Sequence, residues 1–385
     1  MNAIEPFKLE RYFAKHEFSA RRLLCSSDCE TTSIRDLLAM ESGATEAFLD
    51  FRLGYTETRG APALREAIAA GYAPAAEGGP GPEGIFVHAG AEEAILNLCL
   101  ALVGPGDHVV VNHPAYQSLE ALPRWRGAAV SAWDFRDDGS RWYLDPDDLS
   151  TLLVPKTKLV VVNAPHNPTG ALPTRDEFEA IVEHCRRAGA LLLVDEVYRG
   201  LERDPRRALP PACEIYENGI SLNVLSKTAG LAGLRIGWLA TRRTDVLDAV
   251  AVVKDYNSLC SSGPSEFLAG IAVRHFAALA ARNRGLCASN LALFESFVAG
   301  HPGFAALTPP EGSSICFPRL AGKAERDFGG DAEAMALALL ADEGILLLPG
   351  KLYGHDAKHW RLGFGRADFP EGLRELELWT MRRGY

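Results

Sequence analysis

The stretch from residue 159 to residue 195 reads LVVVNAPHNPTGALPTRDEFEAIVEHCRRAGALLLVD and decides the fold. Its two ends, Leu159–Asn163 and Ala190–Asp195, are short apolar runs that each finish in a polar residue. Apolar runs of this length are typical of strands buried on both faces of a parallel sheet. The intervening Thr174–Arg187 has helical periodicity, so the stretch predicts a strand–helix–strand unit.

The predicted helix has start and stop signals in the sequence. Thr174 is a predicted N-cap, and Glu177 stands three residues later, as in a capping box. Gly189 follows as a stop signal. Apolar residues recur on one face of this helix, at Phe178, Ile181, Val182 and Cys185.

The alternation of strands and helices extends in both directions from this stretch. Asp107–Asn112 and Ile220–Leu225 predict two further strands, and the Gly- and Pro-rich residues 75–83 predict a loop. Such alternation predicts an α/β fold with a mainly parallel central sheet. In such folds, ligands bind beyond the carboxyl ends of the strands.

The chain divides into three predicted parts. Residues 1–45 are irregular and polar, with a short helix expected near Ile34–Met40, and we expect them to pack with the smaller domain. Residues 46–275 are expected to form the large domain that carries the sheet, and residues 276–385 a smaller α+β domain. Toward and within this last part we expect helices over 266–281 and 290–298, then short strands at 314–318, 344–348 and 360–364.

The composition argues against several classes of protein. Of the 385 residues, 47% are hydrophobic and 23% charged, and the formal net charge is −10. This net negative charge argues against a protein that binds nucleic acids or anionic membranes through basic residues. The charged N-terminus predicts no signal peptide, so we expect a cytoplasmic protein. Eight scattered cysteines predict reduced, mostly buried thiols, and no metal site is expected.

Polar side chains follow the predicted strands in a combination that indicates one chemistry. Taken singly, Asn167, Asp195, Lys227 and Arg235 have ordinary roles in turns, caps and ion pairs. Together they suit a pyridine aldehyde phosphate. Lys227 would form a Schiff base with the aldehyde, Asp195 would pair with the protonated ring nitrogen, and Arg235 would hold the phosphate. Asn167 and Tyr198 would hydrogen-bond the phenolate oxygen of the ring.

The chain resembles the fold-type I, class I/II aminotransferases, which use pyridoxal 5'-phosphate (PLP). The resemblance implies a homodimer that moves an amino group from an L-amino acid to a 2-oxo acid in amino acid metabolism. It rests on segments spread over roughly residues 50–365. These are Tyr55–Arg65 (YTETRGAPALR), His113–Tyr116 (HPAY), Asn167–Gly170 (NPTG), Asp195–Tyr198 (DEVY), Ser226–Gly237 (SKTAGLAGLRIG), Leu348–Gly350 (LPG) and Arg361–Phe364 (RLGF).

The resemblance also assigns roles around the cofactor. Tyr116 is expected to stack on the pyridine ring. Gly90, Ala91 and Glu92 are expected to open a helix whose backbone N–H groups bind the phosphate. The family usually has a hydroxyl three residues before the lysine, but Val224 stands there, so Ser226 is expected to replace that contact.

Further roles concern the substrate and a second subunit. Arg361 is expected to bind the substrate α-carboxylate, with Arg366 as a weaker candidate. Tyr55 is expected to reach the phosphate of the neighbouring subunit, which gives shared active sites. Ser261 and Ser262 are candidates for the same region. His113–Pro114 and Asn167–Pro168 are candidates for cis peptide bonds.

A different reaction of the same cofactor is an alternative. The usual Gly-rich substrate segment near the N-terminus is replaced by residues 24–30 (LCSSDCE), where Asp28 and Glu30 would suit a guanidinium or ammonium group. Residues 254–259, 316–320 and 361–365 are similar to PLP-dependent cyclases of the capreomycidine synthase type. The alternative is therefore elimination or cyclisation of a modified, basic amino acid. A binding or regulatory protein without turnover is disfavoured, because Lys227, Asp195 and Arg235 are all present.

Overall fold

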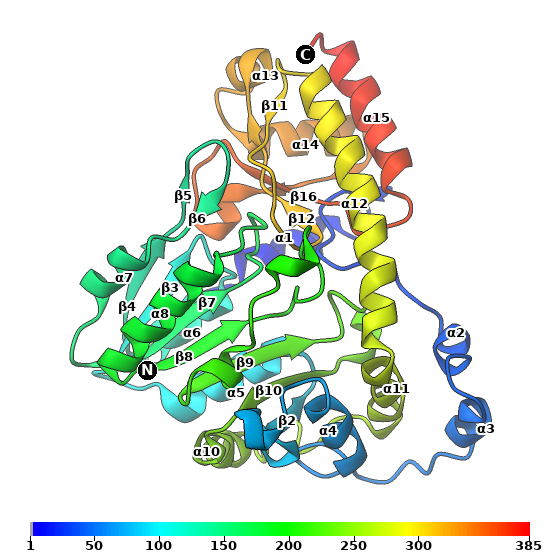
Figure 1. Cartoon of the computed structure of the whole chain (residues 1–385). Helices are drawn as coiled ribbons and strands as arrows, with labels where there is room; N and C mark the ends of the chain where they lie inside the picture. Colours follow the sequence, from blue (N-terminus) through cyan, green and yellow to red (C-terminus); the bar gives the residue numbers. More distant parts are fainter. Residues whose placement is uncertain (1–2) are drawn as a thin grey trace.

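The computed structural model describes residues 3–385, and its centre is a seven-stranded sheet (Figure 1). The strands lie in the order β2 (Ile85–His88), β10 (Gly237–Thr241), β9 (Gly219–Val224), β8 (Leu191–Asp195), β7 (Thr157–Asn163), β3 (His108–His113) and β4 (Ala129–Asp134). From β9 to β4 all neighbours are parallel, and β10 is antiparallel to both β2 and β9. The predicted α/β fold with a mainly parallel sheet is confirmed.

The stretch that decides the fold forms the predicted unit of β7, α8 (Arg175–Ala188) and β8. The Thr174 hydroxyl accepts a hydrogen bond from the Glu177 N–H (3.2 Å), and the Glu177 carboxylate accepts one from the Thr174 N–H (2.7 Å). This is the predicted capping box. Gly189 ends α8 with φ 67°, a conformation that glycine adopts without steric cost.

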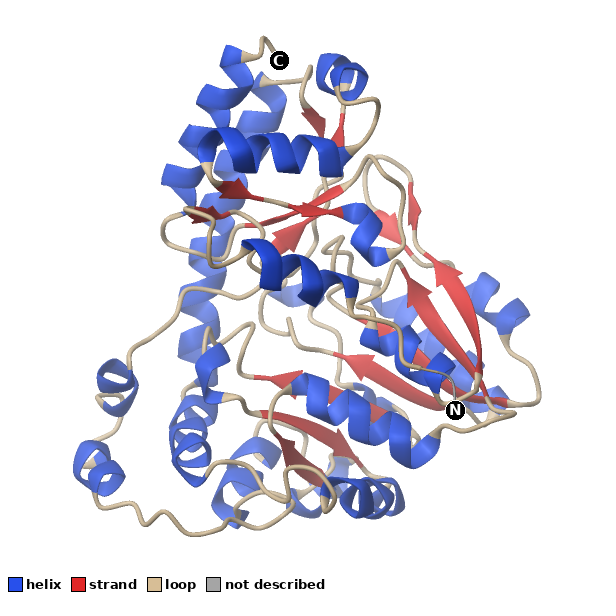
Figure 2. Cartoon of the chain, turned by 180° about the vertical axis from the view of Figure 1, so that it is seen from behind, coloured by secondary structure: helices blue, strands red, loops and turns tan. Residues whose placement is uncertain are grey.

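Helices cover both faces of the sheet (Figures 1 and 2). Leu159 and Val161 of β7 pack toward α5 (Ala91–Leu102), α6 (Ser118–Trp125) and α10 (Thr244–Lys254). Val160 and Val162 pack toward α7 (Pro146–Leu152), α8 and α9 (Ala212–Ile215). Successive side chains of a strand point to opposite faces, so a strand covered on both faces must be apolar throughout.

A third group of helices covers the β2–β10 edge of the sheet. It consists of α2 (Ile34–Leu38), α4 (Pro62–Ala69) and α11 (Gly263–Arg274), and α3 (Ala44–Leu49) follows α2 along the chain. The helix predicted near residues 34–40 is α2. The predicted 75–83 loop contains two single 3₁₀ turns, Ala75–Glu77 and Pro82–Gly84.

The C-terminal part is built on one long helix, α12 (Phe276–Gly300). The helices predicted over 266–281 and 290–298 are instead α11 and an unbroken α12, divided at His275. Asn283 and Asn290 do not break α12, because both are buried and donate side-chain hydrogen bonds to the Thr228 carbonyl (2.8 Å) and the Phe364 carbonyl (3.0 Å).

The remaining elements are short. Helices α13 (Gly322–Asp327), α14 (Ala332–Glu343) and α15 (Phe369–Arg382) pack with α12 around a three-stranded sheet of β12 (Ile315–Cys316), β16 (Trp360–Gly363) and β15 (Leu348–Pro349). Three strand pairs complete the set: β11 (Ala305–Ala306) with β13 (Arg319–Leu320), β5 (Arg136–Asp137) with β6 (Trp142–Tyr143), and β1 (Arg22–Leu23) with β14 (Ile345–Leu346). Single 3₁₀ turns lie at Pro205–Arg207, Ala232–Leu234 and Gly350–Tyr353.

The N-terminal residues contact both parts of the molecule (Figure 2). Helix α1 (Lys8–His16) packs against the 3₁₀ turn at Gly350–Tyr353, and β1 pairs with β14. In contrast, α2 packs against α11 beside the central sheet. The segment between β1 and α2 therefore crosses from one part to the other.

Three smaller expectations are also answered. All eight cysteines lie within residues 3–385; they are free thiols, and only Cys260 is not buried. The His113–Pro114 and Asn167–Pro168 bonds are cis as expected, and so is Ala164–Pro165. Across the described chain, no helix is both long and apolar enough to cross a membrane.

Candidate active site

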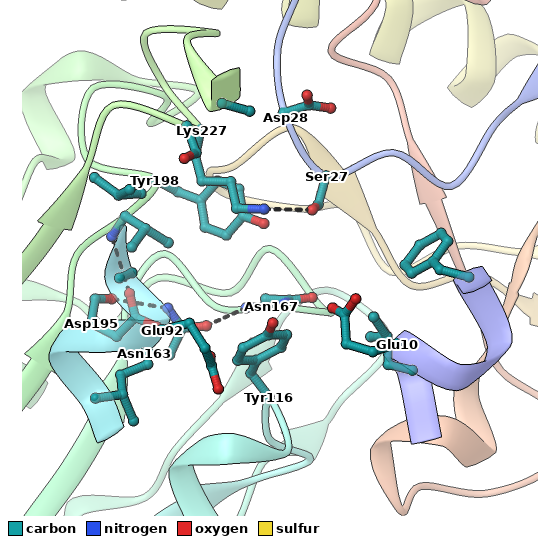
Figure 3. Close-up of a pocket in the computed structure, with 18 of the residues that line it drawn as sticks. Glu10, Ser27, Asp28, Glu92, Tyr116, Asn163, Asn167, Asp195, Tyr198 and Lys227 are labelled. Atoms are coloured by element: carbon teal, nitrogen blue, oxygen red, sulfur yellow. Dashed lines mark hydrogen bonds between the residues drawn. The ribbon is translucent and has the colours of Figure 1, made fainter. Parts of the chain in front are cut away.

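A pocket of about 480 Å³ opens at the carboxyl ends of β7, β8 and β9 (Figure 3). The first turns of α5 lie on one side of it, and α1 lies on another. The structure brings ten predicted site residues together here: Ala91, Glu92, Tyr116, Asn167, Asp195, Tyr198, Ser226, Lys227, Arg235 and Arg361. Tyr55 lies outside this pocket and is 93% exposed.

Lys227 follows β9 and points into the pocket. Its Nζ donates a hydrogen bond to Ser27 Oγ at 2.8 Å. Burial lowers the Lys227 pKa, and nearby Arg361 lowers it further, whereas Asp28 and Asp195 act to raise it. The balance favours the neutral, nucleophilic amine more than in an exposed lysine.

Asp195 ends β8 as a buried carboxylate, only 5% exposed. It accepts a hydrogen bond from the Val197 N–H at 3.2 Å, and among residues 3–385 no cationic side chain hydrogen-bonds to it. Burial raises its pKa to about 7, although the Val197 N–H and Lys227 act in the other direction. A buried carboxylate that has no cationic hydrogen-bond partner is suited to bind a cationic group of a ligand, such as a protonated pyridine nitrogen.

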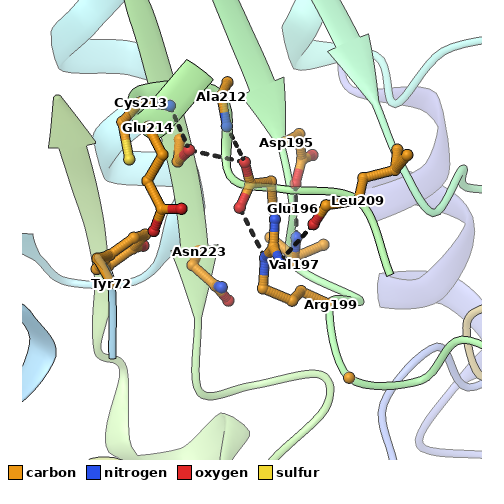
Figure 4. Close-up of polar contacts among 12 residues, drawn as sticks. Tyr72, Asp195, Glu196, Val197, Arg199, Leu209, Ala212, Cys213, Glu214 and Asn223 are labelled. Carbon is orange, nitrogen blue, oxygen red and sulfur yellow. Dashed lines mark hydrogen bonds and ion pairs between the residues drawn. The ribbon is translucent and has the colours of Figure 1, made fainter. Parts of the chain in front are cut away.

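Glu196, the next residue, points away from the pocket into an ion-paired network (Figure 4). Its carboxylate accepts from the Ala212 N–H (3.0 Å) and the Ser221 hydroxyl (2.7 Å), and it pairs with Arg199 Nε at 2.9 Å. Arg199 also donates to the Leu209 carbonyl at 2.8 Å. This network anchors the turn after β8, so Asp195 alone of the two acids faces the pocket.

Arg361 lies on β16 with 2% exposure and makes no ion pair with a carboxylate in the described chain. Its Nη2 donates to the Cys25 carbonyl at 2.6 Å, and its Nη1 contacts the Tyr353 hydroxyl. An unpaired buried guanidinium suits a substrate carboxylate. Arg366, the weaker candidate, is already paired with Asp28 at 2.7 and 3.2 Å.

The start of α5 and Arg235 form a site suited to a phosphate. Gly90, with φ 91°, precedes α5, and a Cβ there would collide with the Arg235 guanidinium. Arg235 makes only long hydrogen bonds to the Ala89 and Ala232 carbonyls, 3.4 Å each. The buried Ser226 hydroxyl has no partner among the described residues. Backbone N–H groups at a helix start, a guanidinium and a free hydroxyl are phosphate ligands.

The remaining polar groups fit the rest of the cofactor. The buried Tyr198 hydroxyl likewise lacks a partner in the part of the chain described. The Asn167 backbone N–H donates to Asn163 Oδ1 at 2.6 Å, which fixes the turn that presents the Asn167 amide. Val224, at the position of the expected family hydroxyl, lines the pocket with an apolar side chain. The residues present therefore fit PLP, with Ser226 in place of that hydroxyl.

Glu10 and Ser27 line the pocket but were not predicted as site residues from the sequence, and neither was Tyr353, which contacts Asn167 and Arg361. Glu10 and Ser27 lie about 200 residues before Lys227, in segments without a recognisable motif, so only the structure reveals them. Tyr353 lies three residues after the LPG segment, so this motif could have pointed to it from the sequence alone. Of the two acids proposed to receive a basic group, Asp28 lines the pocket, whereas Glu30 accepts a hydrogen bond from the Ala367 N–H (2.7 Å) outside it.

Comparison with known proteins agrees with this geometry. The model of the family "Aminotransferase class I and II" matches residues 28–371. Capreomycidine synthase of Streptomyces vinaceus is 32% identical over 390 aligned positions, covering 99% of this chain and 96% of that protein. The arginine–pyruvate transaminase AruH of Pseudomonas aeruginosa is 28% identical, covering 87% of this chain and 84% of that protein.

Solved structures give the same result. The crystal structure of a PLP-dependent aminotransferase from Streptococcus suis has a TM-score of 0.90 and 30% sequence identity, and the match covers 99% of each chain. The PLP-dependent cyclase OrfR has a TM-score of 0.88 and 30% identity, and the match covers 100% of this chain and 99% of that one. The fold is therefore that of fold-type I PLP-dependent enzymes, as predicted.

Proposed function

This chain belongs to the aminotransferase class I and II family, and on that basis we propose that it transfers the amino group of an L-amino acid with a cationic side chain to a 2-oxo acid. The family and its solved relatives depend on PLP, and so does this enzyme. The single observation that carries the proposal is the placement of Lys227 and Asp195 in one pocket with the unpaired Arg361.

The proposed cofactor contacts include two buried hydroxyls that lack partners among the described residues, those of Ser226 and Tyr198. The start of α5, Ser226 and Arg235 hold the phosphate, and Tyr198 and Asn167 bind the phenolate oxygen. When bound, PLP supplies an aldehyde that condenses with an amine and a ring that accepts the electron pair from Cα. Asp195 keeps the proton on the ring nitrogen, which strengthens that electron sink.

Lys227 and Arg361 act on the substrate in this proposal. Arg361 orients the α-carboxylate, so that the Cα proton faces the Lys227 side of the site. Lys227 Nζ, whose pKa is lowered by burial, would take that proton from Cα and hold it for return to the bound group. Ser27, which accepts a hydrogen bond from Nζ, holds the amine in place between these steps.

The charges around the pocket indicate a cationic side chain on the substrate. Glu10, Asp28 and Glu92 line it in addition to Asp195 (Figure 3). The Glu92 pKa is raised to about 7, mainly by burial and also by the charges of Glu10 and Asp195, although the hydrogen bond from Ser118 acts to lower it. The cations Lys227, Arg235 and Arg361 are needed by the cofactor and the α-carboxylate. Asp28 is already paired with Arg366, and Asp195 is assigned to the ring nitrogen, so Glu10 and Glu92 are the carboxylates that favour a guanidinium or ammonium group.

Cyclisation is the second candidate, and a specific observation favours it. Two relatives that match essentially the whole chain at 30% identity or more are a capreomycidine synthase and a PLP-dependent cyclase. The same pocket would then remove the Cα proton of a hydroxylated basic amino acid, release its hydroxyl group as water, and close a ring by adding a side-chain nitrogen to the carbon that lost the hydroxyl. In that reaction the cofactor keeps its aldehyde, whereas amino transfer converts it to pyridoxamine phosphate.

One experiment separates the two reactions. The purified holoenzyme is incubated without any oxo acid, with arginine, lysine and hydroxylated arginine as cationic donors and with leucine and glutamate as controls. Amino transfer predicts one equivalent of pyridoxamine phosphate and of 2-oxo acid per site, measured by mass spectrometry. A cyclic product without pyridoxamine phosphate establishes cyclisation instead. Equal reaction with leucine would contradict the cationic substrate.

We further propose that the chain forms a homodimer with shared active sites. Large apolar side chains are exposed along one stretch before α4 and again after α10, at Leu49, Leu53, Tyr55, Tyr256 and Leu259. Exposed apolar residues gathered in this way favour burial against another chain. Light scattering tests the mass, and Tyr55→Ala is expected to weaken PLP binding without preventing dimer formation.

A further inference from the structure

Lys254, the last residue of α10, has a fully buried side chain. Its Nζ donates a hydrogen bond to the Val87 carbonyl at 2.8 Å and lies 5.6 Å from the centre of the Phe86 ring. Burying an ammonium group is costly unless opposite charges and hydrogen bonds compensate for it. Two carboxylates, Glu93 and Glu266, provide that compensation.

Glu93 joins Lys254 to the turn between β2 and α5. Its Oε2 lies 3.8 Å from Lys254 Nζ and accepts a hydrogen bond from the Ala89 N–H, while its Oε1 accepts one from the Ser258 hydroxyl. One carboxylate therefore connects the lysine, the residue before Gly90 and the loop after α10. The Ala89 carbonyl is also the acceptor for Arg235 Nη2 at 3.4 Å.

Glu266 makes no ion pair with Lys254 within 4 Å among the described residues, but its charge acts on the same lysine, and it binds the segment before α4. It is 3% exposed, and its Oε2 accepts a hydrogen bond from the Ala61 N–H at 2.7 Å. Its Oε1 accepts from the Thr56 hydroxyl at 3.4 Å. Thr56 is adjacent to Tyr55, the residue proposed to reach the cofactor of a partner subunit.

We propose that the Glu93–Lys254–Glu266 cluster is a positioning device for the phosphate of PLP. It holds the Ala89–Gly90 turn, whose following N–H groups face the phosphate, and it holds the segment that presents Tyr55. Lys254 itself does not line the pocket and acts through the backbone that it binds. The inference rests on the proposed phosphate site, but not on which reaction the enzyme catalyses.

A purely structural ion pair would behave differently. Replacing a buried ion pair by apolar groups is often neutral or stabilising, and removing one partner destabilises the fold as a whole. Removing one partner of a purely structural ion pair would therefore weaken the binding of every ligand in the pocket to a similar extent. A device that positions the phosphate site must instead affect the phosphate group selectively.

The test compares PLP with pyridoxal, which has the same ring and aldehyde but no phosphate. Both are bound to apoprotein without amino acid, and Kd is measured by the visible absorption of the bound ligand. For Lys254→Met and Glu93→Gln we expect the PLP Kd to rise about tenfold or more, with the pyridoxal Kd nearly unchanged. Lys254→Arg keeps the charge and is expected to restore part of the PLP affinity.

The matched control is Lys323→Met, which removes an exposed lysine of α13 far from this cluster and should change neither Kd. The melting temperature of each apoprotein shows whether the variant folds; if Lys254→Met does not fold, Glu93→Gln carries the test. Equal weakening of PLP and pyridoxal, or an unchanged PLP Kd in folded variants, would overturn the proposal. If the wild-type holoenzyme binds PLP but transfers no amino group, that result counts against the proposed reaction only.

Discussion

The Tyr353 hydroxyl donates a hydrogen bond to Asn167 Oδ1 at 2.9 Å, and Arg361 Nη1 donates to the same hydroxyl. Tyr353 is 2% exposed, and Arg361 Nη1 lies 3.4 Å from the same Asn167 oxygen. One buried phenol thus joins the amide proposed to bind the cofactor to the guanidinium proposed to bind the substrate. A shift of either group would be transmitted to the other.

Tyr353→Phe tests this link. Removing the hydroxyl takes away two hydrogen bonds and leaves Asn167 Oδ1 and Arg361 Nη1 with only the long 3.4 Å contact between them, a loss of about 1 kcal/mol per hydrogen bond. We expect the KM for the amino acid to rise about fivefold with little change in cofactor content. Tyr143→Phe on β6 is the control and should leave both unchanged. A variant with wild-type KM would show that Tyr353 only fills space.

Arg361→Lys and Arg366→Lys separate the two candidate arginines. Lysine keeps the charge but loses the planar pair of donors that matches a carboxylate. We expect Arg361→Lys to lower kcat/KM by about 10-fold to 100-fold with PLP binding retained. Arg366→Lys, which touches the substrate pocket only through Asp28, should have a much smaller effect. A larger loss of kcat/KM in Arg366→Lys than in Arg361→Lys would assign the substrate carboxylate to Arg366 instead.

Lys227→Ala tests the nucleophile. Borohydride reduction of the wild-type holoenzyme should fix the cofactor to the peptide that contains Lys227, as measured by mass spectrometry. The variant should retain no fixed cofactor and essentially no turnover. Lys158→Ala, an exposed lysine on β7, is the matched control. Cofactor fixed to another lysine in the Lys227 variant would contradict the assignment.

Asp195→Asn tests the buried carboxylate through the pH dependence of apoprotein stability. The folded-state pKa is about 7, above the ordinary aspartate value of 3.8, so the folded apoprotein holds an extra proton between these values. Stability therefore falls as pH rises from about 4 to about 7, by a few kcal/mol in total. Asparagine does not ionise. Thermal melts should show the apo variant more stable than wild type at pH 8 and similar to it near pH 4.

When PLP is added, the order of thermal stability of wild type and Asp195→Asn should reverse. The wild-type carboxylate then pairs with the ring nitrogen, which asparagine cannot do as a charged partner. We expect PLP to raise the melting temperature of wild type at pH 8 far more than that of Asp195→Asn. If PLP stabilises both proteins equally, Asp195 does not meet the ring nitrogen.

Glu10→Gln tests the preference for a cationic side chain. Glu10 is exposed on α1 at the pocket edge, so its contribution is moderate. We expect the KM for a cationic amino acid to rise roughly threefold to tenfold, while that for a neutral amino acid is unchanged. Glu46→Gln, an exposed acid on α3, is the control. An equal change for both substrates would remove Glu10 from the specificity proposal.

Much of the cofactor site was predictable from the sequence because of the geometry of parallel strands. Strands β7, β8 and β9 each carry a recognisable apolar run, and their carboxyl ends lie at one edge of the sheet. Residues that closely follow such runs, as Asn167, Asp195 and Lys227 do, must therefore meet there. No knowledge of long-range contacts was needed.

Other parts depended on contacts that no local pattern encodes. Both Asp195 and Glu196 follow β8, and only the Glu196–Arg199 network shows which acid faces the pocket. The unbroken α12 differs from the two predicted helices, and its buried Asn283 and Asn290 donate side-chain hydrogen bonds to carbonyls that are distant in the sequence. The Lys254 cluster likewise depends on contacts between four separate regions of the chain, which no local pattern reveals.

By itself, the sequence determined the α/β fold, the family and the PLP chemistry, because strand and helix periodicity and the residues at strand ends are local properties. The tertiary structure decided which acids surround the substrate. Glu10, Ser27 and Asp28 belong to irregular N-terminal segments, and long-range contacts place them, such as the 2.8 Å bond from Lys227 to Ser27. An irregular segment has no periodicity to reveal its position, so its neighbours are known only once the whole chain is folded.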